Sequence, residues 1–215
     1  MKNIVIFDLD GTLLNTLDDL TDAVNASLNQ YGYPAREPDE IASFLGHGFA
    51  WLIDHTLPAN VEVDTHDAVL ASFKKCYMAH CMDRTQPYDG IPALLDALSA
   101  RGCRLAIVSN KGDAAVRELA KKYFPSIPVA VGEKPDVRKK PAPDTVLEAL
   151  LALNADAADA VYVGDSEVDA ETARNAGLPC VSVSWGFRSR SLLESLKTAA
   201  VIDRPAELLP LLDRL

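Results

Sequence analysis

Short apolar runs recur along the chain, and polar or charged residues follow where each run stops. The opening run, Asn3 to Phe7, is rich in Ile and Val, which is typical of a strand buried on both faces of a parallel sheet. Similar or weaker runs lie at 103–108, 128–131, 160–163, 180–184 and 201–202. The pattern therefore predicts a sheet whose strands are widely separated in the sequence.

The segments between these runs have the spacing of amphipathic helices. Apolar residues recur on one helical face from Leu17 to Leu28, and Thr16 stands three residues before Asp19, the spacing of a capping box. Further helices are predicted at 37–45, 49–57, 64–82, 91–100, 113–124, 143–153 and 168–176, with a leucine-rich helix at the end of the chain.

Strand and helix signals alternate in the first residues and again after residue 83, but the stretch between them contains helices only. Alternation of strands and helices implies right-handed crossovers and a parallel sheet covered on both faces. We therefore predict an α/β fold with a doubly wound, Rossmann-like parallel sheet core formed by residues 1–14 and 84–215. Residues 15–83 are predicted to form an inserted, all-helical domain of about four helices.

Composition narrows the classes of partner. The chain has 215 residues, of which 31 are acidic and 21 basic, giving a formal charge of −10. No basic stripe is visible that would release counterions from a nucleic acid, so we expect no nucleic-acid partner. No apolar run approaches the length of a membrane span, and the N-terminus leads directly into a strand, so we expect a cytoplasmic protein with no membrane partner.

Two carboxylates follow the first predicted strand. Asp8 and Asp10, with Gly11 and Thr12 behind them, concentrate negative charge in one small loop. Each acid could simply stabilise a turn, but two acids two residues apart favour a bound cation, most simply a divalent one. Ligands of doubly wound sheets bind beyond the carboxyl ends of the strands, which is where this loop lies.

Polar residues also follow two later strands. Ser109 and Asn110 come after the run at 103–108, whereas Asp165 follows the run at 160–163, with Asp169 one helical turn later. Parallel strand ends can share one crevice, and Lys140, placed just before a predicted helix, adds a cation. Such a set is what a magnesium ion and a phosphoryl group would need.

Four motifs in order make the sequence resemble the haloacid dehalogenase-like superfamily of phosphohydrolases. They are Asp8-Leu9-Asp10-Gly11-Thr12, then Ser109, then Lys140 with Pro141-Ala142-Pro143-Asp144, and finally Gly164-Asp165-Ser166 with Asp169. Each motif alone is weak, but the ordered set is specific. The resemblance covers the whole chain, because the helical insert lies where this family places its first type of cap (C1), and it is greatest to phosphoglycolate phosphatases.

The resemblance implies a magnesium-dependent phosphatase that acts through an aspartyl-phosphate. It makes Asp8 the nucleophile, Asp10 the general acid and base, and Thr12 the residue that orients Asp10. Ser109 and Asn110 would donate hydrogen bonds to the phosphoryl oxygens, and Lys140 would neutralise their charge. The implied magnesium ligands are Asp8, the backbone carbonyl of Asp10 and Asp165. Asp169 completes the metal site, but it is expected to orient Lys140 or a metal-bound water rather than to bind the metal directly.

The sequence does not determine which residues select the substrate or which phosphate ester is bound. Gly46-His47-Gly48 is either a turn that presents backbone N–H groups and His47 to the substrate or a plain interhelix turn. Arg188 and Arg190, which follow the apolar run at 180–184, could reach a substrate anion, but they are expected to be solvated. The partner is expected to be a small phosphorylated metabolite, with 2-phosphoglycolate first. The alternative substrates are sugar phosphates and pyrophosphate. The alternative functions are a phosphomutase reaction and a non-catalytic binding module. The protein is expected to be a monomer or a homodimer.

Overall fold

Six parallel strands form the central sheet of the computed structural model, which describes residues 2–215. Their order across the sheet is β5-β4-β1-β6-β7-β8, so β1 lies in the middle and the chain leaves it on one side and returns on the other. The strands are β1 (Ile4–Phe7), β4 (Arg104–Gly112), β5 (Val129–Glu133), β6 (Ala160–Gly164), β7 (Cys180–Val183) and β8 (Ala200–Ile202). The chain reversal at β1 opens a crevice at the carboxyl ends of β4, β1 and β6.

Ten α-helices accompany the sheet in the described part of the chain. Four belong to the predicted insert: α1 (Leu17–Gln30), α2 (Pro38–Phe44), α3 (Phe49–Thr56) and α4 (Val63–His80). The others are α5 (Ile91–Ala100), α6 (Asp113–Tyr123), α7 (Asp144–Ala152), α8 (Glu167–Ala176), α9 (Arg190–Ser195) and α10 (Leu208–Leu211). None of the helices described in residues 2–215 is both long and apolar enough to cross a bilayer. The predicted α/β fold with a parallel sheet is confirmed.

Two hydrophobic clusters hold the sheet, one on each face. Alternate residues of β1 point to opposite sides: Val5 and Phe7 pack with α5, α6 and α10, while Ile4 and Ile6 pack with α7 and α8. Every residue of β1 is buried, which explains the continuous apolar run in the sequence. The layered core therefore follows from burial of the strands on both faces.

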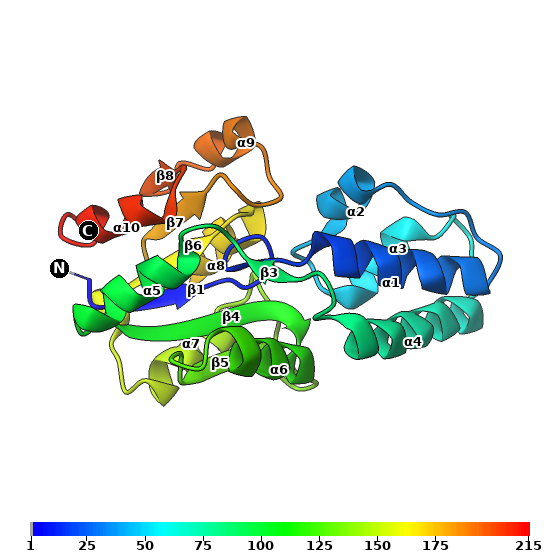
Figure 1. Ribbon diagram of the computed structural model, residues 1–215, viewed down its shortest axis with the longest axis horizontal. Coiled ribbons are helices and arrows are strands. Elements are labelled where there is room, and N and C mark those ends of the chain that lie inside the picture. Colours follow the sequence, from blue (N-terminus) through cyan, green and yellow to red (C-terminus); the bar gives the residue numbers. More distant parts are fainter. Residues whose placement is uncertain (1) are drawn as a thin grey trace.

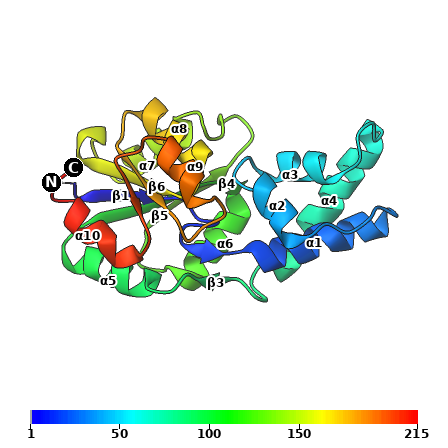
Figure 2. The ribbon, with the colours of Figure 1, turned by 90° about the horizontal axis from the view of Figure 1, so that it is seen from above.

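Helices α1–α4, called the helical unit below, lie beyond the carboxyl end of the sheet (Figures 1 and 2). Helix α1 packs along α4, and α2 and α3 complete the group. The chain passes to and from this unit through a short antiparallel ribbon, β2 (Leu14–Asn15) and β3 (Gln86–Pro87). The sequence did not predict this ribbon or α9, because two-residue strands and a six-residue helix are too short to show a periodicity.

The predicted capping box at the start of α1 is wrong. The Thr16 side chain caps no backbone N–H of this helix, and its hydroxyl donates instead to Asp10 Oδ1 at 2.7 Å. The buried Asp19 carboxylate accepts hydrogen bonds from the backbone N–H of Arg84 and from both the N–H and hydroxyl of Thr85. Asp19 therefore joins the first helix of the helical unit to the segment that returns to the core.

Replacing Asp19 with alanine should lower the free energy of unfolding by about 2–4 kcal/mol, because it leaves the two buried donors of Thr85 and the partly buried N–H of Arg84 without acceptors. Urea denaturation would measure the loss. The matched control is Asp22→Ala, which removes an exposed acid of the same helix that pairs with the Arg84 side chain and should cost less than about 1 kcal/mol. Equal losses in the two variants would contradict this account of Asp19.

Candidate active site

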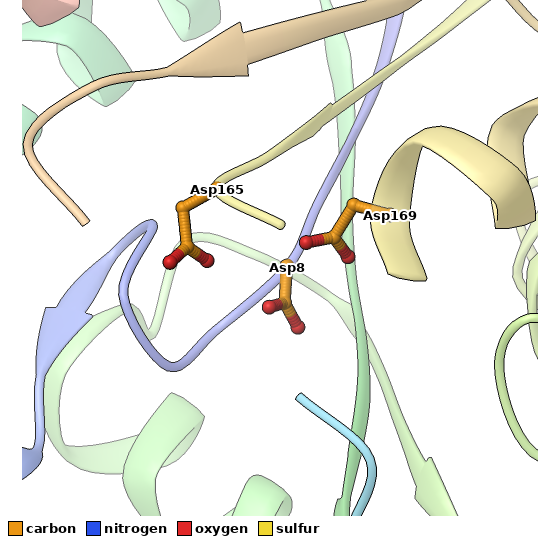
Figure 3. A group of neighbouring side chains, drawn as sticks. All are labelled: Asp8, Asp165 and Asp169. Carbon is orange, nitrogen blue, oxygen red and sulfur yellow. The ribbon is translucent and has the colours of Figure 1, made fainter. Parts of the chain in front are cut away.

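Three acidic side chains meet where β1, β6 and α8 come together. Asp8 follows β1, Asp165 follows β6 and Asp169 lies in the first turn of α8; all three are buried. One carboxylate oxygen of each lies within 4.8 Å of the others, and Figure 3 shows the carboxyl groups gathered around one space. The register pairs Phe7 of β1 with Val163 of β6, so the two strands end together and bring Asp8 and Asp165 to the same edge.

Lys140 provides the positive charge of this cluster. Its Nζ donates to Asp8 Oδ1 and to Asp169 Oδ1, both at 2.8 Å, and also to the Tyr162 hydroxyl at 3.0 Å and the Val108 carbonyl at 3.3 Å. Only 2 % of the Lys140 side chain is exposed. The ammonium is therefore fully engaged and holds two of the three acids in place.

Burial changes the proton affinities of these groups. It raises the pKa of Asp8 to about 7; Lys140 opposes the shift and Asp169 adds to it. The pKa of Asp165 lies well above its ordinary value because of burial and, next, the charges of Asp169 and Asp8. Burial opposes the charge of Lys140, but Asp169 and Asp8 outweigh it, so the pKa of Lys140 lies above its ordinary value. Mutually repelling carboxylates of this kind favour a cation between them.

Two close backbone approaches hold Asp165. Gly11 has a φ of +83°, and a Cβ there would lie 2.4 Å from Asp165 Oδ2; at Gly186 it would lie 2.3 Å from Asp165 Cβ. Only glycine fits at either position. The N–H of Phe187 donates to Asp165 Oδ2 at 2.8 Å and the hydroxyl of Thr12 donates to Oδ1 at 3.3 Å. The loops after β1 and β7 therefore clamp this carboxylate.

The Thr12 hydroxyl donates to Asp165 and not to Asp10, so the prediction that it orients Asp10 is wrong. The Thr16 hydroxyl takes that place, at 2.7 Å from Asp10 Oδ1, because the turn at Gly11 directs Thr12 toward Asp165 instead. Asp10 also lies 2.8 Å from the ammonium of Lys111. Neither Thr16 nor Lys111 was expected in the site; a lysine directly after Ser109-Asn110 was the only signal in the sequence.

The second motif serves mainly to hold the site together. Ser109 Oγ accepts a hydrogen bond from the N–H of Lys111 at 3.2 Å and lines the cavity described below. Asn110 donates to the carbonyls of Gly46 and Lys140, both at 2.9 Å, and accepts from the N–H of Lys140 at 2.8 Å. These contacts use both amide hydrogens of Asn110 and leave none for a phosphoryl oxygen, contrary to expectation.

Asp169 is bonded through both of its oxygens. Oδ1 accepts from Lys140, and Oδ2 accepts from the N–H and hydroxyl of Ser166, which in turn caps α8. A capping box therefore does occur in this chain, at Ser166 and Asp169. This arrangement makes Asp169 the residue that positions Lys140.

The turn at Gly46-His47-Gly48 faces the core through its carbonyls. The carbonyl of Gly46 accepts from Asn110, and that of His47 accepts from Lys139 Nζ at 2.9 Å. The His47 ring stacks on Trp51, with 4.8 Å between ring centroids, rather than lining the cavity. Burial lowers the pKa of His47. Of the three residues, Gly46 and Gly48 border the cavity, and His47 does not.

Arg188 is not solvated, so that prediction is wrong. Only 9 % of its side chain is exposed, and it pairs with Glu167 and donates to the carbonyls of Ala42 and Leu45 in the helical unit. Arg190, in contrast, is exposed and pairs with Glu194 and Asp203. The sequence could not separate the two arginines, because only the fold brings the end of α2 beside Arg188.

A cavity of about 30 Å³ lies between the core and the helical unit. Its walls include both acids of the first motif, two residues in the last part of β4, and the glycines of the turn after α2: Asp8, Asp10, Ser109, Lys111, Gly46 and Gly48. The cavity brings two carboxylates, Asp8 and Asp10, together with the ammonium of Lys111. Such a set can transfer an acyl or phosphoryl group.

Comparison with known proteins identifies the family of this chain. The sequence model for haloacid dehalogenase-like hydrolases matches residues 5–183. Phosphoglycolate phosphatase from Aquifex aeolicus is 32% identical over 98% of this chain and 96% of its own. The phosphoglycolate phosphatase from Rhodospirillum rubrum is 34% identical over 97% of this chain and 90% of its own. A solved Lactobacillus delbrueckii protein, provisionally named phosphoglycolate phosphatase, is 35% identical with a TM-score of 0.91 over 97% of both chains. The chain therefore belongs to the haloacid dehalogenase-like hydrolase family.

Proposed function

We propose that this phosphatase hydrolyses a small phosphomonoester, with 2-phosphoglycolate as the leading substrate, through an aspartyl-phosphate on Asp8 and with bound Mg²⁺. The observation that carries the proposal is the placement of Asp8: its carboxylate is buried, borders the cavity and accepts a hydrogen bond from Lys140 at 2.8 Å. A carboxylate fixed in this way is suited to attack a phosphorus atom held in the same cavity.

Two carboxylates would divide the chemistry. In the first step Asp8 forms a bond to phosphorus as the bond to the ester oxygen breaks, and Asp10 gives that oxygen a proton. In the second step water attacks the acyl phosphate, Asp10 takes a proton from it, and Asp8 is released. The hydrogen bond from Thr16 keeps the Asp10 carboxyl turned toward the cavity, and Lys140 offsets negative charge on the transferred group.

The donor set fits magnesium. Asp8, Asp165 and Asp169 offer carboxylate oxygens, the ligands that this hard cation prefers. Asp8 and Asp165 are the proposed direct ligands, with the backbone carbonyl of Asp10. Each Asp165 oxygen accepts a single hydrogen bond, whereas Asp169 Oδ1 accepts from the Lys140 ammonium and Oδ2 accepts from both the N–H and the hydroxyl of Ser166. When bound, Mg²⁺ offsets the repulsion between an anionic nucleophile and an anionic phosphate.

The small size of the cavity supports a small leaving group. Its volume of about 30 Å³ holds little more than one or two water molecules, so a hexose would require the helical unit to move much farther than a two-carbon acid would. The names of the Aquifex aeolicus and Rhodospirillum rubrum relatives support 2-phosphoglycolate in particular. We propose that residues 15–83 act as the cap that encloses such a substrate.

Removal of the metal should abolish turnover. Excess chelator is expected to lower the rate on an aryl phosphate by at least about 100-fold, and Mg²⁺ should restore it, because the anionic groups would otherwise repel each other. Asp165→Asn should raise the Mg²⁺ concentration needed for half-maximal rate by at least about tenfold. A rate that is indifferent to chelator would contradict the metal assignment.

Asp8→Asn should lower the rate by at least about 10³-fold while the protein remains folded, because an amide is a poor nucleophile. Acid-quenched wild-type enzyme should carry one phosphoryl group on the peptide that contains Asp8, as measured by mass spectrometry. The control Asp159→Asn removes an exposed acid just before β6 and should be fully active. Activity retained in Asp8→Asn would exclude the covalent route.

A panel of phosphate esters tests the substrate. We expect kcat/KM for 2-phosphoglycolate to exceed that for glucose 6-phosphate by at least about tenfold, because the much larger hexose leaving group does not fit the small cavity. Steady-state release of inorganic phosphate measures each rate. A preference for a hexose phosphate, or isomerisation of a hexose phosphate without phosphate release, would exclude the proposed substrate.

A further inference from the structure

Two buried lysines border the site, and they differ in how their charges are satisfied. Lys140 has four acceptors within hydrogen-bond distance, two of them carboxylates. Lys111, at the end of β4, is as deeply buried, with 1 % of its side chain exposed. Within residues 2–215 its Nζ has no acceptor in hydrogen-bond geometry. Lys111 therefore carries a buried charge that the folded chain leaves incompletely satisfied.

The surroundings of Lys111 are apolar except on one side. Its Nζ lies 4.5 Å from the ring centroid of Tyr77 and 5.4 Å from that of Phe49, both in the helical unit. Figures 1 and 2 show how the carboxyl end of β4 meets this unit. The aromatic faces attract the cation, but they are not full hydrogen-bond acceptors for its three N–H groups. They also exclude the water molecules that would otherwise accept these hydrogen bonds.

The charged partner of Lys111 lies on the cavity side. Nζ lies 2.8 Å from Asp10 Oδ1, an ion pair without the angle of a hydrogen bond. That oxygen also accepts a hydrogen bond from Thr16. Lys111 borders the same cavity as Asp8 and Asp10, so its free N–H groups can reach a molecule bound there. A buried ammonium in this position is prepared for an anion.

The position of Lys111 indicates which part of a substrate it meets. Asp8 and Lys140 lie at the phosphoryl end of the cavity, whereas Asp10 acts on the oxygen that leaves with the alcohol. Lys111 contacts Asp10, and in the described residues it makes no ion pair with Asp8. An anion on the alcohol part of the substrate would therefore lie closest to Lys111.

We propose that Lys111 binds a carboxylate carried by the leaving alcohol and thereby selects carboxylate-bearing phosphomonoesters. This inference rests on the proposed phosphatase function and adds to it the residue that sets specificity. The aromatic walls strengthen the attraction, because a charge pair shielded from water is weakened less by solvent. A neutral leaving group of the same size would leave the ammonium unsatisfied, which is a basis for discrimination.

The test compares two esters that differ at one group. 2-Phosphoglycolate carries a carboxylate where 2-hydroxyethyl phosphate carries a neutral CH₂OH, and the wild type should prefer the former in kcat/KM. In Lys111→Met, which keeps the length of the side chain against the rings, the ratio of the two kcat/KM values should fall by at least about 30-fold. The loss should appear mainly in KM for 2-phosphoglycolate. Lys111→Gln is the second variant if Lys111→Met does not fold.

Lys139→Met is the matched control. Lys139 is the neighbouring lysine that reaches the helical unit, but it donates to the carbonyl of His47 and does not contact Asp10. Its loss removes an equal charge near the site and should leave the ratio within about threefold of the wild type. A ratio that falls equally in both variants would mean that net charge, and not Lys111, selects the substrate.

A binding measurement separates this inference from the proposed function. With Mg²⁺ present, calorimetry on Asp8→Asn should show tighter binding of 2-phosphoglycolate than of 2-hydroxyethyl phosphate, and Lys111→Met in that background should remove the difference. Absence of turnover of both esters would overturn the phosphatase proposal, but this comparison would still decide the role of Lys111. An unchanged ratio, or an equal loss for both esters, would overturn the inference and assign Lys111 to Asp10 or the phosphoryl group.

Discussion

The structure depends on burying three carboxylates and one ammonium together at the carboxyl edge of the sheet. Asp8, Asp165, Asp169 and Lys140 are each at most 5 % exposed. Transfer of an isolated charge from water into such a place costs several kcal/mol, and a poorly paired set would cost more than its attractions return. The hydrogen bonds of Lys140 and the backbone N–H groups around the acids offset much of that cost. With one carboxylate balanced by the ammonium, two carboxylates remain, and their negative charge makes the edge receptive to a cation.

This constraint explains the accessory residues. Gly11 and Gly186 lack side chains so that the loops can approach Asp165, and Ser166 both caps α8 and fixes Asp169. The same edge is joined to the helical unit by polar contacts from Asn110, Lys139 and Arg188 to backbone carbonyls. Contacts of this kind exchange with water more readily than apolar packing, which suits the cap role proposed for the helical unit.

Much of the fold could be predicted because the decisive signals were local. Strands buried on both faces read as continuous apolar runs, and the six strands of the sheet were predicted within a few residues of their observed bounds. Helix boundaries were good where glycine or proline marked them, as at Ala176 before Gly177. The acids of the site and Lys140 were predicted because each lies just after a strand, in the first turn of a helix or just before a helix. Thr12, Asn110 and Arg188 were assigned incorrectly because their partners lie in loops distant along the chain.

By itself, the sequence determined which strands are buried, which loops carry acids, and that a helical insert separates the first motif from the second. Those properties depend on residue type and spacing over a few positions, where physical preferences are strong. Only the tertiary structure decided which hydroxyl orients Asp10, that Arg188 reaches the helical unit, and that Lys111 lies against two aromatic rings beside Asp10. Each of these contacts joins residues whose positions depend on the order of strands in the sheet and on the position of the helical unit at its edge. No local sequence pattern encodes either of these.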